Sequence, residues 1–281
     1  MLMKQIIMIE GLPGSGKTTF ARKISAFLSS REVDNVFYAE GDLHPVDLAW
    51  IAILTKEDLS NLLKQFPSLK DEIFPNMRLI DNRFFLAYTK VSIDNETKDF
   101  YEYCQKYEIY RSLDANDFFE EHRKLWNRFI EEKFDNDFTY VFECILLQNH
   151  INQLILQYVL KEEEIINYFQ RFKAVFQDVN MKIYYIKQMN HKKTLDRIIE
   201  ERRTNNKELY KDWIDHVIEY LESFPISKVK GYMGYNGVLK YMSDRMSLEL
   251  KVLMVLGIDY QVFELDEMYE TVLENIKKDL S

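Results

Sequence analysis

Apolar residues gather in five short runs along the chain, each bounded by turn-forming or acidic residues, and this pattern predicts five β-strands. The predicted strands span residues 4–10, 35–40, 138–144, 181–186 and 260–265. Their apolar density is typical of a parallel sheet that is covered on both faces. Between the first two runs, apolar residues recur at helical spacing, which predicts a strand–helix–strand unit. The pattern therefore predicts an α/β fold in which a five-stranded, mostly parallel sheet is the middle of three layers.

Helical periodicity accounts for most of the chain between the second and third predicted strands. One apolar stripe covers residues 55–66 and stops at Pro67, and a second stripe covers residues 113–134. We therefore interpret residues 46–135 as a helical insertion over the ligand-binding edge of the sheet, and as the candidate binding region for a second substrate.

Two more helices are predicted around residues 151–160 and 163–177, before the fourth strand. A second insertion, residues 190–251, begins with a basic helix and contains three glycines within seven positions, from Gly231 to Gly237. This glycine-rich stretch is interpreted either as a flexible loop that contacts substrate or as an ordinary connection between helices.

Composition and charge narrow the class of protein. The chain has 281 residues, of which 47% are hydrophobic, and we predict a single domain with insertions over residues 1–281. The formal net charge of −9 means that the surface as a whole repels polyanions, so nucleic-acid binding is disfavoured. No apolar run reaches the roughly 18 to 20 residues of a membrane span. Cys104 and Cys144 lie far apart, which argues against a disulfide framework and fits a cytoplasmic setting.

The segment GLPGSGKT, from Gly11 to Thr18, fits the P-loop pattern G-x-x-x-x-G-K-[ST] between a predicted strand and a predicted helix. In a P-loop, backbone N–H groups and the helix N-terminus surround the phosphates. The lysine contacts the β- and γ-phosphates, and the hydroxyl group binds Mg²⁺. The pattern predicts ATP and Mg²⁺ as cofactors. The residues predicted to bind the nucleotide are Gly11, Pro13, Gly14, Ser15, Gly16, Lys17, Thr18 and Thr19.

With this motif and the long insertions between strands, the chain resembles the P-loop kinases that act on small molecules. That group includes nucleotide, nucleoside, shikimate and gluconate kinases and the chloramphenicol phosphotransferase. The resemblance covers the sheet and the order of the insertions. It implies a three-layer P-loop NTPase fold with a helical insertion and a lid, and phosphoryl transfer from ATP to a small molecule.

Several kinases of this group carry an acidic residue after the second strand, where it accepts the proton of the attacking hydroxyl. Here the stretch VFYAEGDLHPVD places Glu40 and Asp42 at this point. Gly41 lets the chain turn sharply, so that the Asp42 carboxylate can face the γ-phosphate. The resemblance therefore implies that Asp42 is the general base. The alternative is that Asp42 caps a turn before Pro45, and His44 is interpreted as a turn residue or a substrate contact.

Glu143 interrupts the third apolar strand, and burial of a lone carboxylate is costly unless it is paired or lies near a cation. In P-loop enzymes, an acidic residue at the end of the strand beside the P-loop strand holds Mg²⁺ through water, and Glu143 resembles that residue. It is a candidate metal ligand together with Thr18, or a base; the alternative is a buried ion pair. Gln148 and Asn149, which follow, either orient substrate or cap the next helix.

The segment HKKTLDRIIEERRTNN after the fourth strand is the candidate lid. Lys193 and Arg197 share one helical face, and Arg202 and Arg203 follow. Kinases of this type close such a lid over the triphosphate, where arginine stabilises charge on the transferring phosphoryl group. The resemblance therefore implies catalytic roles for Arg197 and Arg202. The alternative is a solvated helix whose arginines pair with glutamates.

Five further residues are weaker candidates. Arg78, Arg83 and Arg111 in the first insertion are possible anchors for an acceptor molecule. Asp266 and Glu267, after the last strand, stand where the loop in this group borders the adenine.

Together these residues predict an ATP-dependent kinase. Lys17 and the lid arginines stabilise charge, Asp42 is the base, and Thr18 and Glu143 surround Mg²⁺. The predicted partner is a small-molecule acceptor such as a metabolite, a nucleoside or nucleotide, or an antibiotic, and no membrane is involved. The alternatives are a regulatory P-loop NTPase without such an acceptor, and a polynucleotide kinase. The oligomeric state is left open.

Overall fold

The computed structural model of this chain describes residues 5–91, 97–111, 114–134, 138–204, 211–265 and 269–280. The chain forms two compact units. The first unit comprises Met1–Phe37 and Asp135–Ser281, and the second comprises Tyr38–Phe134. The second unit covers nearly the same residues as the insertion that the sequence pattern places at 46–135.

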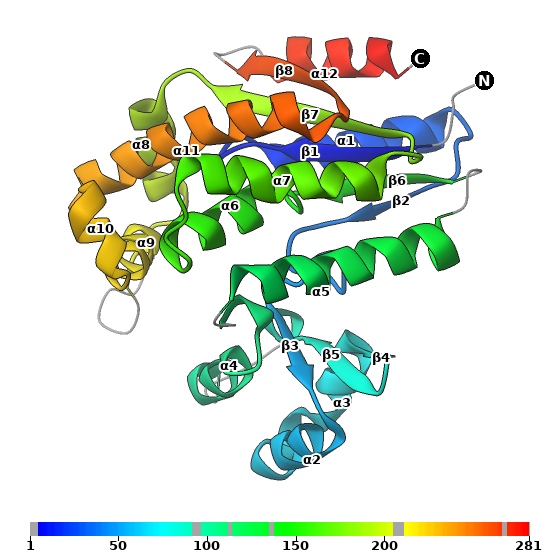
Figure 1. The fold of residues 1–281 in the computed structure, drawn as a ribbon, viewed down its shortest axis with the longest axis vertical. Helices are drawn as coiled ribbons and strands as arrows, with labels where there is room; N and C mark the ends of the chain where they lie inside the picture. Colours follow the sequence, from blue (N-terminus) through cyan, green and yellow to red (C-terminus); the bar gives the residue numbers. More distant parts are fainter. Residues whose placement is uncertain are drawn as a thin grey trace. The chain divides into compact units, whose positions relative to one another are not determined.

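A five-stranded sheet with the strand order β2-β6-β1-β7-β8 forms the centre of the first unit (Figure 1). Its strands are β1 (Ile6–Glu10), β2 (Asn35–Tyr38), β6 (Thr139–Glu143), β7 (Met181–Gln188) and β8 (Asp259–Leu265). The strand β1 pairs in parallel with β6 and β7, and β7 pairs in parallel with β8. All five predicted strands are therefore confirmed. Parallel strands that are buried on both faces are apolar along their whole length, which is why the sequence pattern identifies them.

Helices cover both faces of this sheet, as Figure 1 shows. On one face, α1 (Lys17–Ser30) and α12 (Tyr269–Asp279) bury apolar side chains against Ile7 and Ile9 of β1. On the other face lie α6 (Leu147–Leu156), α7 (Glu162–Phe176) and α11 (Gly234–Leu256), and α11 contacts both of the other two. The predicted α/β class is confirmed, and the arrangement is consistent with a P-loop NTPase-like fold.

Three further helices belong to the described part of the first unit: α8 (His191–Glu201), α9 (Trp213–Glu222) and α10 (Pro225–Lys230). The glycine-rich stretch lies between two helices. Gly231 ends α10 with a φ of +74°, and Gly234 begins α11. A Cβ at Gly237 would lie 2.2 Å from the carbonyl carbon of Tyr232, so the absence of a side chain there permits the close turn. Of the two interpretations of this stretch, the structure shows the connection between helices.

A three-stranded antiparallel sheet lies in the second unit, with the order β3-β5-β4. Its strands are β3 (Ile51–Leu54), β4 (Met77–Ile80) and β5 (Arg83–Ala87). The sequence pattern predicted the helices of this region but not this sheet. The strands are four or five residues long, and β3 carries apolar residues on both faces, so neither strand alternation nor helical spacing distinguishes it.

Helices pack on both faces of this second sheet. They are α2 (Lys56–Gln65), α3 (Lys70–Ile73), α4 (Thr97–Gln105) and α5 (Ala115–Arg128), with a π-helical turn at Phe129–Lys133 and short 3₁₀ turns at Pro67–Leu69, Phe74–Asn76, Tyr88–Lys90 and Ile109–Arg111. The helices predicted over 55–66 and 113–134 are confirmed in α2 and α5. Leu59 and Phe100 pack with Leu54 in one cluster, whereas Leu125 packs with Ile51 in another.

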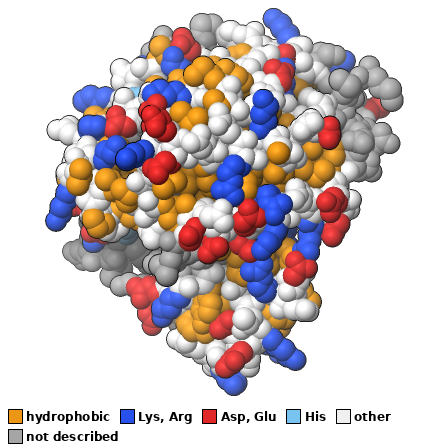
Figure 2. All heavy atoms as spheres, in the orientation of Figure 1, with side chains coloured by type: hydrophobic (Ala, Val, Ile, Leu, Met, Phe, Trp, Pro, Cys, Tyr) orange, Lys and Arg blue, Asp and Glu red, His pale blue; other side chains and the backbone are white. Residues whose placement is uncertain are grey.

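The surface carries charges of both signs. On the face drawn in Figure 2, lysine and arginine side chains lie among aspartate and glutamate side chains. Within the described residues, no helix has the length and apolar character needed to cross a membrane.

Candidate functional site

The predicted P-loop connects β1 to α1 in the first unit. Gly14 and Gly16 have φ values of +77° and +80°, in the region that favours glycine, and Gly16 is the N-cap of α1. A Cβ at Gly11 would lie 2.5 Å from the backbone oxygen of Ile186, so a side chain there would collide with β7. The loop therefore requires glycine for both its turn and its close approach to the neighbouring strand, and the N-terminus of α1 is left facing the loop.

Lys17 is buried at the start of α1, with 6% of its surface exposed. Its ammonium group donates to the backbone oxygen of Leu12 at 3.0 Å and to the Oε1 atom of Gln148 at 3.3 Å. The lysine thus curls back over its own loop, and two neutral oxygens hold it there. The sequence predicted that Gln148 either orients substrate or caps a helix; in the structure it positions this ammonium group. Asn149 donates to the backbone oxygen of Cys144 at 3.0 Å.

Thr18 and Glu143 meet at the edge of the sheet. Glu143 is the last residue of β6, which lies beside β1, and its carboxylate accepts a hydrogen bond from the Thr18 hydroxyl. Glu143 is almost fully buried. Hydroxyl and carboxylate oxygens are the ligands that Mg²⁺ prefers, so the donor set fits this ion, with water completing the shell. The described residues contain no cluster of three or more His, Cys, Asp or Glu side chains suited to a metal.

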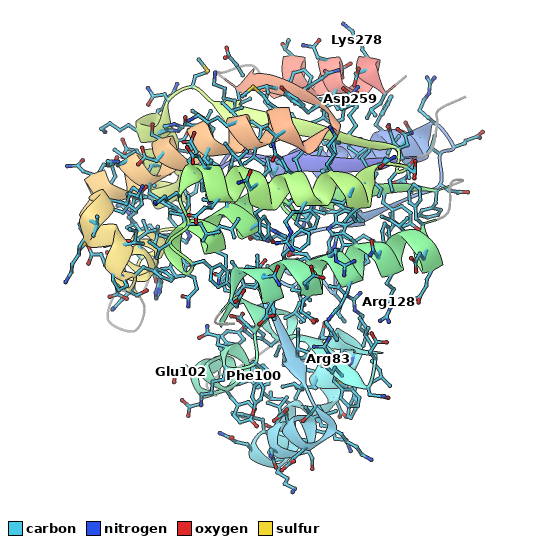
Figure 3. All side chains as sticks on the ribbon, in the orientation of Figure 1. Arg83, Phe100, Glu102, Arg128, Asp259 and Lys278 are labelled. Atoms are coloured by element: carbon cyan, nitrogen blue, oxygen red, sulfur yellow. The ribbon has the colours of Figure 1, made fainter. Side chains whose placement is uncertain are left out.

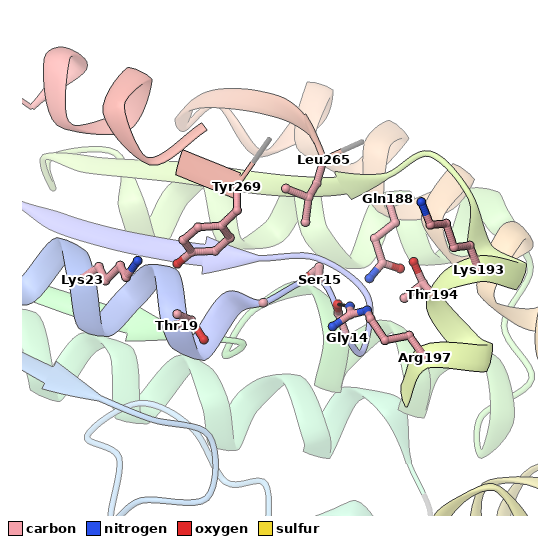
Figure 4. Close-up of a pocket in the computed structure, with 11 residues that line it drawn as sticks. Gly14, Ser15, Thr19, Lys23, Gln188, Lys193, Thr194, Arg197, Leu265 and Tyr269 are labelled. Carbon is pink, nitrogen blue, oxygen red and sulfur yellow. Dashed lines mark hydrogen bonds between the residues drawn. The ribbon is translucent and has the colours of Figure 1, made fainter. Parts of the chain in front are cut away.

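A pocket of about 560 Å³ opens beside the P-loop (Figure 4). We call it the P-loop pocket; it is lined by Gly14, Ser15, Gly16, Thr19, Lys23, Gln188, Lys193, Thr194, Arg197, Leu265 and Tyr269. Arg197 of α8 donates to the backbone oxygen of Gly14 at 2.7 Å and pairs with Glu201 at 3.0 Å. A Cβ at Gly14 would lie 2.2 Å from the Cδ1 atom of Ile198, so α8 packs directly on the loop.

The P-loop pocket has the properties of an anion site. Three cationic side chains, Lys23, Lys193 and Arg197, line it together with the helix N-terminus. The Ser15 hydroxyl is buried beside it and has no hydrogen-bond partner within the part of the chain that the structure describes. Tyr269 contributes a ring to the wall, stacked on Phe20 with centroids 4.1 Å apart. The volume lies in the range of about 300–1,000 Å³ that small-molecule sites have, so these residues fit a nucleotide.

The two predicted lid arginines lie in different places. Arg197 lines the P-loop pocket, whereas the guanidinium of Arg202 lies over the ring of Trp213, 5.2 Å from its centroid. Arg203 pairs with Glu200 at 2.6 Å, as the alternative of a solvated helix expects. The structure therefore brings Arg197, but not Arg202, to the wall of the P-loop pocket, because α8 ends at Glu201 and the chain turns away from its helical face.

Glu10 is a buried residue of this region that the sequence analysis overlooked. It ends β1 just before the P-loop and is fully buried; its Oε1 atom accepts from the backbone N–H of Leu146 at 2.8 Å. Burial, together with the charge of Glu249, raises the pKa of Glu10 from its ordinary value of 4.5 to about 7. The same sequence feature that singled out Glu143 could have identified Glu10, since both are carboxylates at the end of an apolar strand.

Asp42 lies in the second unit, in a turn where Gly41 has a φ of +80°. Its carboxylate accepts from the backbone N–H of Ala39 at 2.7 Å and pairs with Lys90 at 2.8 Å. These are the contacts of the turn cap that the sequence offered as an alternative. The role of Asp42 as general base stays a prediction. His44 is buried, and burial and the charge of Arg78 hold the pKa of its imidazole well below the usual value, so it is neutral.

The candidate acceptor arginines have partners within the second unit. Arg78 donates to the backbone oxygen of His44 at 2.5 Å, and burial lowers its pKa to about 10. Arg83, labelled in Figure 3, pairs with Glu121 at 2.8 Å. The side chain of Arg111 lies outside the described residues, as do Asp266 and Glu267.

Comparison with known proteins found a distant structural likeness. No protein-family model matches the chain. No curated protein matches it either. Among solved structures, the chain is similar to the crystal structure of EHV4-TK complexed with TP4A, at 10% sequence identity and a TM-score of 0.36, over 100% of this chain and 91% of that one.

Proposed function

We propose that this protein is an ATP-dependent phosphotransferase that transfers the γ-phosphate to a hydroxyl or phosphate group of a small molecule. The observation that carries the proposal is the P-loop itself. It lies between a central strand and a helix, with its glycines at positive φ and the Thr18 hydroxyl on the Glu143 carboxylate. A structural glycine turn would not require a buried lysine, a buried acid and a cation-lined pocket at the same place.

Each residue has a proposed task. The N–H groups at the start of α1 and the Ser15 hydroxyl bind phosphate oxygens, and the Lys17 ammonium exchanges its neutral partners for them. Thr18 and Glu143 would hold Mg²⁺, which supplies charge neutralisation at the phosphates when bound. Arg197 stabilises negative charge from the α8 side of the P-loop pocket.

The acceptor side of the reaction rests on the sequence pattern alone. Asp42 is proposed as the general base that takes the proton of the attacking hydroxyl. Residues 46–135 are the proposed acceptor-binding region. The substitution Asp42→Asn tests the first point, because loss of a base lowers turnover far more than it lowers ATP affinity.

The test of the proposed function is a transfer assay. The protein is incubated with γ-labelled ATP, Mg²⁺ and a library of hydroxylated metabolites, nucleosides and antibiotics, and labelled products are separated from free phosphate. We expect label on at least one acceptor, and only when that acceptor is present. Glu143→Gln is the matched variant, since the amide keeps the shape of the side chain and loses its charge; it should raise the Mg²⁺ concentration needed for half-maximal transfer.

Two outcomes would contradict the proposal. If ATP binds but label appears only as free phosphate with every acceptor, the protein is an NTPase and not a phosphotransferase. If ATP does not bind at all, measured by calorimetry with Mg²⁺ present, the P-loop is structural.

A further inference from the structure

A second cavity, of about 120 Å³, lies in the first unit at the other end of the P-loop. We call it the aromatic cavity. Leu12 and Pro13 of the loop form one side, and the remaining walls come from α6, α9 and α11. Its wall is mostly apolar, and Trp213, Tyr220 and Tyr241 contribute rings. The P-loop pocket shares no lining residue with this cavity, since the former uses residues 14–19 of the loop.

Among the described residues, one charged group lines this apolar cavity. Arg245 of α11 is 4% exposed, and its Nε atom donates to the Oε1 atom of Glu249 at 2.6 Å. The Tyr185 hydroxyl donates to the other oxygen of Glu249 at 2.5 Å. The Nη2 atom of Arg245 is buried and has no hydrogen-bond partner among the described residues. A guanidinium remains charged and cannot accept, so this buried donor needs an oxygen acceptor.

The rings are held in place by their own hydrogen bonds. Asn152 donates to the Tyr220 hydroxyl at 2.8 Å and accepts from the Tyr241 hydroxyl. A second guanidinium, that of Arg202, lies over Trp213. The cavity therefore has aromatic walls, a buried cationic donor and a further cation on its Trp213 wall, whereas the neighbouring anion, Glu249, is already bonded to Arg245 and Tyr185. This combination selects for a flat apolar group that carries negative charge.

The geometry points to a binding site for a small aromatic carboxylate, with the ring among Trp213, Tyr220 and Tyr241 and the carboxylate on the Nη2 atom of Arg245. A single ring is the largest group of this kind that the cavity takes, because its volume of about 120 Å³ is somewhat below that of the apolar cavity of roughly 150 Å³ that takes up benzene. Carboxylate is the natural partner of a guanidinium in a dry site, where a charged hydrogen bond is strongest. This site is distinct from the P-loop pocket, and its occupation requires no nucleotide.

The probe is 4-fluorobenzoate, titrated into the full-length protein without nucleotide and followed by fluorine NMR. 4-Fluorobenzyl alcohol is the matched neutral probe, with the same ring and no charge. We expect saturable binding of the acid at one site per chain, and affinity for the acid at least about tenfold above that for the alcohol, the ratio expected from one charged hydrogen bond.

Two variants locate the site. Val217→Phe fills the aromatic cavity from α9 and should abolish binding of both probes, whereas Val229→Phe, at a position 81% exposed on α10, should leave both affinities unchanged. Arg245→Lys keeps a positive charge but removes the Nη2 donor, and should reduce the preference for the acid over the alcohol about tenfold. Circular dichroism confirms that each variant is folded.

Three results would overturn the assignment: no saturable binding of 4-fluorobenzoate to the native protein, equal affinity for acid and alcohol, or unchanged acid affinity in folded Val217→Phe. The first two need no variant, so they decide the matter even if Arg245→Lys does not fold. Loss of acid binding together with intact transfer activity would leave the proposed phosphotransferase standing.

Discussion

The two ends of the P-loop face very different surroundings. Gly14, Ser15, Gly16 and Thr19 line the P-loop pocket, where Lys193 and Arg197 are exposed. Leu12 and Pro13 line the aromatic cavity, where Arg245 is buried and already paired with Glu249. One loop therefore separates a pocket lined by exposed cations from a mostly apolar, aromatic one.

The difference shows how burial decides whether an arginine can exchange its partner for a ligand. An exposed arginine costs little to keep and can move to a phosphate, because water replaces its contacts as it moves. A buried arginine must keep its partner, since removing one member of a buried pair leaves an uncompensated charge. Arg197 is thus suited to a ligand whose charge develops during a reaction, and Arg245 to a ligand of fixed charge.

The largest effect is expected for Lys17→Ala, which removes the cation from the P-loop. Transfer should fall by about 10²- to 10³-fold, the usual loss when one preorganised charge stabiliser is removed, because the proposed cation on the β- and γ-phosphates is lost. Steady-state assays with labelled ATP measure this loss. The exposed Lys228→Ala on α10 is the control and should be fully active. Collapse of thermal stability in Lys17→Ala would instead mean that the lysine is structural.

The substitution Glu10→Gln tests the effect of burial on a charged group in the central sheet. The measured quantity is the free energy of unfolding as a function of pH. The folded state raises the pKa of this buried carboxyl from 4.5 to about 7, so the folded state favours the protonated form. The protonated Glu10 carboxyl makes its full contribution to the stability of the folded state below about pH 4.5, and this contribution is lost as the pH rises through 7. A glutamine has no proton to lose, so at pH 8 the variant should be more stable than the native protein by up to about 3 kcal/mol, and near pH 5 by little.

Denaturant unfolding at pH 5 and pH 8 measures this difference. Glu274→Gln, an exposed residue of α12, is the control and should change stability equally at both pH values. The same change in stability at both pH values for Glu10→Gln would show that the Glu10 carboxyl keeps an ordinary pKa.

A smaller effect is expected from the pair Arg197→Ala and Arg203→Ala. Both arginines are exposed and each pairs with a glutamate, but only Arg197 contacts the P-loop, at the backbone oxygen of Gly14. Transfer should fall by about tenfold in Arg197→Ala, the loss expected from one charged hydrogen bond, and by less than about twofold in Arg203→Ala, whose surface pair contributes little. Equal turnover of the two variants would contradict the proposed role of α8 as a lid.

The smallest effect is expected in the wall of the aromatic cavity. Tyr220→Phe and Tyr241→Phe each remove one hydrogen bond to Asn152. Tyr220 is 44% exposed and Tyr241 is 6% exposed. Loss of the exposed hydroxyl should lower the free energy of unfolding by about 0.5 kcal/mol, and loss of the buried one by about 1–2 kcal/mol. Denaturant unfolding compares them, and an equal cost would mean that burial does not govern this hydrogen-bond chain.

Local sequence determined a large part of this protein. The five strands of the first sheet, the helix that begins at Lys17 and the glycines of the P-loop all follow from signals within about ten neighbouring residues, because apolar runs, helical spacing and positive-φ glycines are local properties. Glu143 could also be singled out, since a carboxylate in an apolar strand needs a partner wherever the strand lies.

Only the tertiary structure decided which residues meet. The family resemblance implied that Thr18 and Glu143 lie together although they are 125 positions apart, whereas nothing in the sequence connected Glu10 with Leu146, 136 positions away. The second sheet was not predicted, because its apolar residues were assigned to the helical insertion over residues 46–135. The resemblance placed Arg202 beside the phosphates, but its guanidinium lies over the ring of Trp213, because α8 ends at Glu201 and Arg202 no longer follows its helical face. The aromatic cavity is assembled from four separate segments, and packing between helices, which depends on the whole core, brings Arg245 to its wall.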